Sequence, residues 1–283
     1  MASPALIQIF LLNPYPENPM HITANGIQFN VQIDGREGAP WLMFSNSHCT
    51  TLELWDEMVE RFKDRYHILR YDTRGHGGTA APPGNYTQDE LAGDVAAILD
   101  VLKIDRVHFC GISIGGQTGL GVAIHHPDRL LSLTAANARY DVPPPVMKAW
   151  DDRIAIVEKG GTEAIAGPTV GRWFEANYPA KNPERVARIQ AMFEKVSRQG
   201  YIGCAIAIRD LNYREALSKI NLPVLLISGK QDSSATEDMV NTMHGMIRGS
   251  RLEMLNPAGH LTVVEQPKAF GDALESFLAT VPA

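Results

Sequence analysis

Residues 109–116 read Phe-Cys-Gly-Ile-Ser-Ile-Gly-Gly and contain the pattern Gly-x-Ser-x-Gly, with Ser113 at its centre. An apolar run beginning at Arg106 precedes the pattern like a strand, and residues 114–124, rich in Gly, Ala and aliphatic side chains, follow it like a helix. A serine on so sharp a strand-to-helix turn is exposed at the top of a sheet. The glycines leave room for neighbouring backbone, and the N-terminus of the helix offers free N–H groups to a developing oxyanion. The bare pattern also arises by chance in Gly/Ser turns, so its context must decide whether Ser113 is a nucleophile.

Strand-like and helix-like segments alternate on both sides of this stretch. Residues 27–33 alternate apolar and polar side chains, and the Asn25-Gly26 turn before them predicts an antiparallel edge with residues 20–24. Capping boxes predict helices that begin after Thr50-Thr51, Thr87 and Ser234. Further strands are expected at residues 41–45, 66–71, 106–112, 130–136, 223–229 and 251–255. This order predicts an α/β fold, a mostly parallel sheet wrapped by helices on both faces.

The alternation stops near Asn137, and residues 139–216 show helical patterns but no clear strand. We expect this block to be a helical lid, inserted after one strand and covering the carboxyl edge of the sheet, where ligands bind in open α/β sheets. The predicted division is an N-terminal arm at 1–19, a core made of 20–138 and 217–283, and the lid at 139–216.

Two residues downstream of Ser113 complete a catalytic constellation. A serine is a weak nucleophile and needs a base that a third group orients. Asp232 follows the expected strand at 223–229, and His260 follows the one at 251–255, so both belong to the same sheet edge as Ser113. The order Ser…Asp…His is the one that accompanies a nucleophile elbow. We predict that Ser113 attacks an acyl carbon, His260 transfers the proton and Asp232 orients His260. The rivals are His244 and Asp238, inside a predicted helix, and His48 and His76, which precede Ser113.

An oxyanion hole requires two donors. The N–H of Ile114, directly after the nucleophile, is one candidate. The loop after the strand at 41–45, running through residues 46–48, is expected to supply the other.

At these residues the chain resembles the α/β-hydrolase superfamily and, more narrowly, the 3-oxoadipate enol-lactonases. The resemblance runs from about residue 22 to the C-terminus and is carried by residues 44–47, 69–77, 109–116, 172–174, 200–201 and 209–210. It implies the α/β-hydrolase fold and a cofactor-free serine hydrolase that opens a small lactone during the breakdown of aromatic compounds. It places Ser113, Asp232 and His260 in the triad, and the N–H groups of Ile114 and His48 in the oxyanion hole.

The chain departs from the family pattern in two places. The family's Asn-Ser-Leu-Gly is Asn46-Ser47-His48-Cys49 here, and the loop after Asp232 lacks the usual proline-rich continuation. Both changes lie beside the predicted pocket, so the substrate can differ from the family's own.

The lactone of that family carries a carboxylate, so the resemblance implies a cation in the pocket. Arg139 and Arg172 are the candidates, although either can be a solvated or structural arginine. Trp150, Trp173 and Phe174 are candidates for the pocket wall, with core packing as the alternative. Arg74 and His76 are expected to form a structural polar network.

Composition narrows the function classes. A net charge of −6 and no Lys/Arg run longer than two argue against nucleic acid or an anionic membrane as partner. Three cysteines without paired spacing argue against disulfides and a zinc site, so we expect no metal and no cofactor. The apolar run at residues 5–12 is too short for a membrane span and lacks the basic residues of a signal peptide, so we expect a cytoplasmic protein.

A small ester or lactone is the expected partner, and a homo-oligomer remains open. The alternatives are a general carboxylesterase, a C–C hydrolase, an amidase or a cofactor-free perhydrolase on the same fold, and a non-catalytic small-molecule receptor. An aspartate would replace Ser113 in a dehalogenase or an epoxide hydrolase of this fold.

Overall fold

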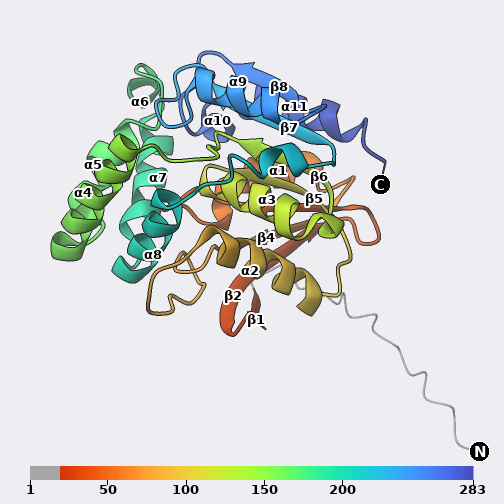
Figure 1. The fold of residues 1–283 in the computed structure, drawn as a ribbon, viewed down its shortest axis with the longest axis horizontal. Helices are drawn as coiled ribbons and strands as arrows, with labels where there is room; N and C mark the ends of the chain where they lie inside the picture. Colours follow the sequence, from red (N-terminus) through yellow and green to blue (C-terminus); the bar gives the residue numbers. More distant parts are fainter. Residues whose placement is uncertain (1–19, 283) are drawn as a thin grey trace, which may run out of the picture.

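The computed structural model describes residues 20–282 of the chain, so the predicted N-terminal arm at 1–19 lies outside the described residues. Eight strands form one sheet in the order β1-β2-β4-β3-β5-β6-β7-β8 (Figure 1). β2 pairs antiparallel with β1 and β4, and every other pairing is parallel. The strands are β1 Met20–Ala24, β2 Ile27–Gly35, β3 Trp41–Ser45, β4 His67–Tyr71, β5 Val107–Ile112, β6 Leu130–Ala136, β7 Val224–Gly229 and β8 Arg251–Leu255. The predicted α/β class and the antiparallel edge are confirmed.

Helices cover both faces of the sheet because successive strand residues point to opposite sides. On β3, Leu42 and Phe44 pack in a core with α1 (Asp56–Phe62) and α11 (Pro267–Leu278). Met43 points the other way, into a core with α2 (Gln88–Val101), α3 (Ile114–His125) and α9 (Glu237–Met246). The central strands are therefore buried on both faces, which explains their continuous apolar runs.

The three capping boxes have different outcomes. Thr87 and Glu90 make the predicted reciprocal bonds at the start of α2. The box at Thr50-Thr51-Leu52-Glu53 is not made, since the Thr50 hydroxyl donates to the Ser47 carbonyl, and the chain first forms a 3₁₀ turn, Leu52–Trp55, before α1. The box at Ser234 was also wrong, since α9 begins after Thr236 without a side-chain cap. The N–H of Ser234 instead donates to the carboxylate of Asp232 two residues earlier, so a local turn around Asp232 displaces the capping box.

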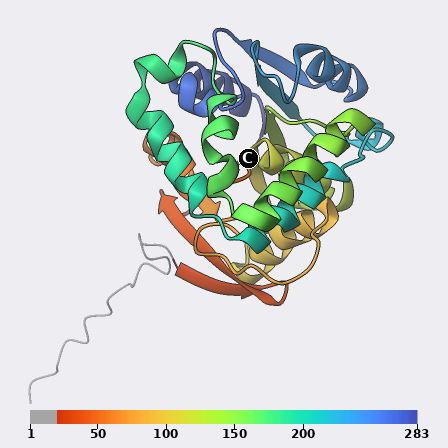
Figure 2. The same ribbon diagram turned by 90° about the vertical axis from the view of Figure 1, so that its left-hand side faces the viewer.

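Helices make up the segment between β6 and β7. They are α4 Pro144–Gly160, α5 Glu163–Gly171, α6 Tyr178–Lys181, α7 Pro183–Glu194 and α8 Arg198–Arg209. They gather at one side of the sheet in Figure 1 and face the viewer in Figure 2. α8 packs closely on the loop after β4, which is possible because both contacting residues are glycines. A Cβ on Gly75 would lie 2.3 Å from the Cα of Gly200. No helix within residues 20–282 is long and apolar enough to cross a membrane.

Candidate active site

Ser113 occupies a strained turn between β5 and α3. Its φ of 57° and ψ of −120° lie in a region that non-glycine residues rarely adopt, and such strain concentrates at functional sites. The turn is tight because Gly111 and Gly115 lack side chains. A Cβ on Gly111 would lie 2.2 Å from the Gly115 carbonyl oxygen, and one on Gly115 would lie 2.3 Å from the Ser45 carbonyl oxygen. The local sequence therefore holds the Ser113 hydroxyl at the carboxyl end of β5.

The structure brings the three predicted catalytic side chains together. The Oγ hydroxyl of Ser113 lies 2.9 Å from Nε2 of His260, and Nδ1 of His260 lies 2.9 Å from Oδ2 of Asp232. Because the carboxylate can only accept, Nδ1 carries the proton, and Nε2 is left to accept from the serine. The three side chains come from loops after β5, β8 and β7, and all three are buried. This arrangement can deprotonate the serine as it attacks an acyl carbon.

Asp232 is stabilised as an anion. Its Oδ1 accepts from the N–H groups of Ser234 and Ala235 at 2.7 and 3.1 Å, while its Oδ2 accepts from His260 and from Nδ2 of Asn137. Burial alone would raise the pKa of Asp232, but His260 and these hydrogen bonds outweigh it and hold the pKa below its ordinary value. The carboxylate is therefore charged and ready to stabilise an imidazolium.

Asn137 is a site residue that the sequence analysis missed. It follows β6 directly with a φ of 46°, and its Nδ2 donates to Asp232 at 2.9 Å and to the Gly259 carbonyl at 3.1 Å. Its Oδ1 accepts from the hydroxyl of Thr262 at 2.5 Å. Asn137 thus ties the aspartate loop to the histidine loop. Its place at the end of a parallel strand was the available signal.

The rival base and acid lie elsewhere. His244 on α9 is bonded to the hydroxyl of Ser250, and Asp238 lies in the first turn of the same helix. Neither residue lines the cavity at Ser113.

Two backbone N–H groups are placed to serve as oxyanion donors. Ile114 is the first residue of α3, so its N–H has no partner within the helix. His48 lies in the loop after β3, and within residues 20–282 we find no acceptor for the N–H of either residue. The loop is held against the start of α3 by the N–H of Gly115, which donates to the Asn46 carbonyl at 3.1 Å. The predicted oxyanion donors therefore lie on two segments that are bonded to each other.

A cavity of about 300 Å³ opens above Ser113. The predicted pocket residues Arg139, Arg172, Trp150 and Trp173 all line it, as do Ser113, His260 and His48. Phe174 is not in the lining and stacks on Tyr178 at a ring distance of 5.1 Å. Arg139 is not free, because its Nε donates to the Asp141 carbonyl at 2.8 Å.

Arg153 is a pocket residue that the sequence analysis did not single out. It reaches the cavity from α4, lies over the Trp150 ring at 4.9 Å, and faces Arg172. Burial, together with the charge of Arg172, lowers the pKa of Arg153. Among the residues that the structure describes, no carboxylate lies within ion-pair distance of Arg153 or Arg172. Two like charges at one cavity without a protein counter-charge form a site for an anion.

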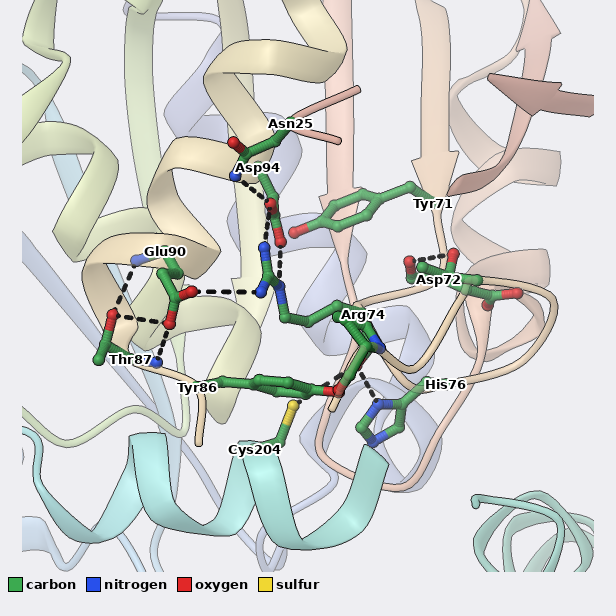
Figure 3. Close-up of polar contacts among 12 residues, drawn as sticks. Asn25, Tyr71, Asp72, Arg74, His76, Tyr86, Thr87, Glu90, Asp94 and Cys204 are labelled. Atoms are coloured by element: carbon green, nitrogen blue, oxygen red, sulfur yellow. Dashed lines mark hydrogen bonds and ion pairs between the residues drawn. The ribbon is translucent and has the colours of Figure 1, made fainter. Parts of the chain in front are cut away.

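The Gly-rich loop after β4 is structural, as predicted for Arg74 and His76. Figure 3 shows Arg74 paired through two nitrogens with the carboxylate of Asp94, both at 2.6 Å, while the guanidinium lies over the ring of Tyr86. His76 is bonded to the Arg74 carbonyl, and burial lowers the pKa of its imidazole to about 4. Burial, followed by His76 and Arg153, lowers the pKa of His48 as well, so neither ring carries a charge at neutral pH.

Glu265 joins the histidine loop to the helical segment. One carboxylate oxygen accepts from the N–H of Gly259 at 2.6 Å, and the other accepts from the N–H of Glu175 at 2.7 Å. The N–H of His260 also donates to the Trp173 carbonyl at 2.6 Å. Burial raises the pKa of Glu265 to about 7, although both backbone donors oppose the shift. His260 is therefore positioned partly by the helical segment between β6 and β7.

Comparison with known proteins shows to which family the chain belongs. The family model described as the alpha/beta hydrolase fold matches residues 40–171. The 3-oxoadipate enol-lactonase 2 of Acinetobacter baylyi is 37% identical over 91% of this chain and 95% of its own, and the 3-oxoadipate enol-lactonase 1 of that species is 34% identical over 90% and 95%. The crystal structure of the enol-lactonase from Burkholderia xenovorans LB400 superposes with a TM-score of 0.89 at 35% identity, covering 92% of this chain and all of that one.

These similarities extend over nearly the whole length of the chain. They are consistent with the strained turn at Ser113 and with the hydrogen bond from Ser113 to His260. The chain belongs to the α/β-hydrolase family, as a hydrolase of esters or lactones that is similar to the 3-oxoadipate enol-lactonases.

Proposed function

We propose that the protein hydrolyses a small lactone or ester that carries a carboxylate, by way of an acyl-enzyme on Ser113. The observation that carries the proposal is the continuous relay from the Ser113 hydroxyl through His260 to Asp232, with 2.9 Å at each step. Nucleophile, base and orienting acid are within hydrogen-bond reach before any substrate is bound, as this chemistry requires.

The reaction proceeds in two halves. Ser113 Oγ bonds to the acyl carbon while His260 Nε2 takes its proton, and the N–H groups of Ile114 and His48 stabilise the oxyanion. The bond from the acyl carbon to the ring or ester oxygen then breaks, and His260 protonates that oxygen. Water, deprotonated by His260, attacks the acyl-enzyme and releases a carboxylic acid and free Ser113. In a lactone the leaving oxygen stays tethered to the acyl group, so the cavity has to hold only one molecule throughout.

The cavity supports a substrate that carries a negative charge. Arg153 and Arg172 face it without a carboxylate partner among residues 20–282, whereas Arg139 is already bonded to a backbone carbonyl. A volume of about 300 Å³ suits a molecule of small size. The relatives named 3-oxoadipate enol-lactonases support an enol-lactone as the substrate. We further propose that this enol-lactone arises in the breakdown of aromatic compounds, and that the helices of residues 139–216 form the lid above it.

Replacing the nucleophile tests the proposal. Ser113→Ala is expected to lower kcat by about 10⁵–10⁶-fold on both 3-oxoadipate enol-lactone and p-nitrophenyl acetate, because nothing else can form the acyl-enzyme. Ser233→Ala is the matched control, since Ser233 lines the same cavity without touching His260.

A fluorophosphonate probe, located by mass spectrometry, is expected to label Ser113 alone. Activity retained in Ser113→Ala would refute the mechanism. A wild type that prefers neutral aryl esters to carboxylate-bearing lactones would instead favour a general esterase, and one that forms peracids efficiently would favour a perhydrolase.

A further inference from the structure

Three metal-ligating side chains meet behind the oxyanion loop, outside the catalytic relay. His48 and Cys49 come from the loop after β3, and His76 comes from the loop after β4. One ligand atom from each lies within 4.8 Å of the other two. The side chains are 4%, 0% and 1% exposed, so the cluster is shielded from solvent. No sequence spacing signalled it, because Cys49 and His76 are 27 residues apart and only the pairing of β3 with β4 brings them together.

Both imidazoles are oriented like metal ligands. Nδ1 of His76 donates to the Arg74 carbonyl at 3.1 Å, as Figure 3 shows, because Nε2 is the atom that accepts from the Cys49 N–H at 2.9 Å. His48 forms a hydrogen bond with the backbone of Tyr201, and its Nε2 is buried with no partner among the described residues. Histidine ligands typically donate one ring N–H to a backbone carbonyl while the other nitrogen binds the metal. An unpartnered buried nitrogen is otherwise a cost to the fold.

Cys49 has its side chain at a position that favours glycine. Its φ of 62° is left-handed, a conformation that is strained for a non-glycine residue. Its thiol is buried and forms no disulfide. A glycine at this position would relieve the strain, so we expect the side chain of Cys49 to have a role of its own.

We propose that His48, Cys49 and His76 bind one Zn²⁺ ion, and that the bound ion inhibits the enzyme. Two imidazoles and a thiolate suit a borderline d¹⁰ cation, with water as the fourth ligand. Two Zn–N bonds and one Zn–S bond form, and the thiol proton leaves to solvent. His76 gives up the hydrogen bond that its Nε2 accepts from the Cys49 N–H. With bonds of about 2.0–2.3 Å, tetrahedral ligand atoms lie about 3.3–3.6 Å apart, so the cluster has to contract by about an ångström.

Inhibition follows from the position of the ligands. The N–H of His48 is the proposed oxyanion donor, and a contraction at His48 and Cys49 would move it. This second half of the proposal rests on the proposed function, whereas the binding of the ion does not. Loss of one oxyanion donor lowers kcat by about 10²–10³-fold, so zinc is expected to reduce turnover of p-nitrophenyl acetate by roughly that factor.

The test uses the full chain and Co²⁺ as a spectroscopic substitute for Zn²⁺. The wild type is expected to bind one Co²⁺ with a thiolate-to-cobalt charge-transfer band and the visible bands of a tetrahedral site, and added Zn²⁺ should remove them. Cys49→Gly, which relieves the strained φ and so should fold, is expected to lose the charge-transfer band. Cys204→Ala, which removes a buried thiol that lies outside the cluster and points at the Arg74 carbonyl, should keep it.

The outcomes separate the two halves of the proposal. Zinc binding would be overturned if the wild type showed no thiolate-to-cobalt band, or if the band persisted in Cys49→Gly. Ser113→Ala should bind cobalt like the wild type, whatever its activity. Zinc inhibition that is strong in the wild type and at least about tenfold weaker in Cys49→Gly would support the inhibitory role. Equal inhibition of both proteins would refute that role.

Discussion

The two walls of the cavity are organised in opposite ways. On the sheet side, Ser113, His260 and Asp232 are buried, and each polar atom of the relay has a partner within 3.1 Å. On the helical side, Arg153 and Arg172 face the same space with no carboxylate partner in the described part of the chain. The wall that we propose to make and break bonds has its hydrogen bonds complete before a substrate arrives. The wall that recognises the substrate still lacks its counter-charge, and the ligand is expected to supply it.

This contrast has a physical reason. Groups that stabilise a transition state act best when they are already oriented, because no reorganisation is then needed at the moment of reaction. An arginine that a protein carboxylate already paired would have to lose that partner before it could bind a substrate anion. Changes to the sheet-side wall should therefore lower kcat, and changes to the helical wall should raise KM for charged substrates.

After the loss of the nucleophile itself, the largest effect is expected from Asp232→Asn. The variant keeps the size of the side chain but leaves His260 without an anion to stabilise its imidazolium, so kcat should fall by about 10⁴-fold with little change in KM. Steady-state kinetics with p-nitrophenyl acetate measures both parameters. Asp238→Asn, at the start of α9, is the control and should retain full activity. A loss below tenfold in Asp232→Asn would show that the sheet-side wall is not the catalytic one.

The second-largest effect is expected on KM, from changes to the two arginines of the helical wall. Arg153→Gln and Arg172→Gln should each raise KM for a carboxylate-bearing lactone by about tenfold to a hundredfold, since a hydrogen bond to a charged group contributes about 1.5–3 kcal/mol. The neutral methyl ester of the same substrate should be hydrolysed almost unchanged. Lys148→Gln is the control on α4, because Lys148 is exposed and paired with Asp152. Equal losses on the charged and neutral substrates would contradict an anion site.

A smaller effect is expected from Asn137→Ala. Asp232 loses one of its hydrogen bonds while the relay to His260 remains, so kcat should fall by about tenfold. The same hydrogen bond helps to hold down the pKa of Asp232, so its loss should raise the pH at which Asp232 is protonated and activity disappears at the acid extreme of the kcat profile. An unchanged pH profile together with lost stability would indicate that Asn137 only supports the two loops.

The smallest effect is expected from a change at Glu265, which joins the loop of His260 to the helical segment. Glu265 has its pKa raised to about 7 in the folded protein, so the folded state holds the proton more tightly than the unfolded state, whose pKa is near 4.5. The contribution of Glu265 to stability is therefore complete at low pH and falls as the pH rises from about 4.5 to 7.

Glu265→Gln should remove this part of the pH dependence. It should also weaken one of the two backbone bonds, because an amide has a single oxygen to accept with. Thermal unfolding of the wild type and of Glu265→Gln at pH 5 and pH 7 tests this prediction. The difference in Tm between the two proteins is expected to change by a few degrees from one pH to the other. A constant difference would show that Glu265 does not titrate in this range.

Much of the sheet-side wall was predictable because its requirements are local or topological. The turn at Ser113 needs glycines beside it, and parallel strands place their carboxyl ends at one edge, so Asp232 and His260 could be assigned from the strands before them. Their catalytic roles remain predictions, whereas the fold and the Thr87 capping box are confirmed. The boxes at Thr50-Thr51 and Ser234 failed because other local turns compete with them: Thr50 bonds back to the Ser47 carbonyl, and the Ser234 N–H bonds to Asp232.

By itself the sequence determined the order of strands and helices, the strained serine turn and the sheet edge where the site lies, since each of these follows from spacing along the chain. Tertiary structure alone decided that Arg153 reaches the cavity beside Arg172, that Asn137 and Glu265 hold the loops of Asp232 and His260, and that His48, Cys49 and His76 meet. The physical reason is that these relations depend on how helices rotate and loops approach across the sheet, between residues that no local pattern connects.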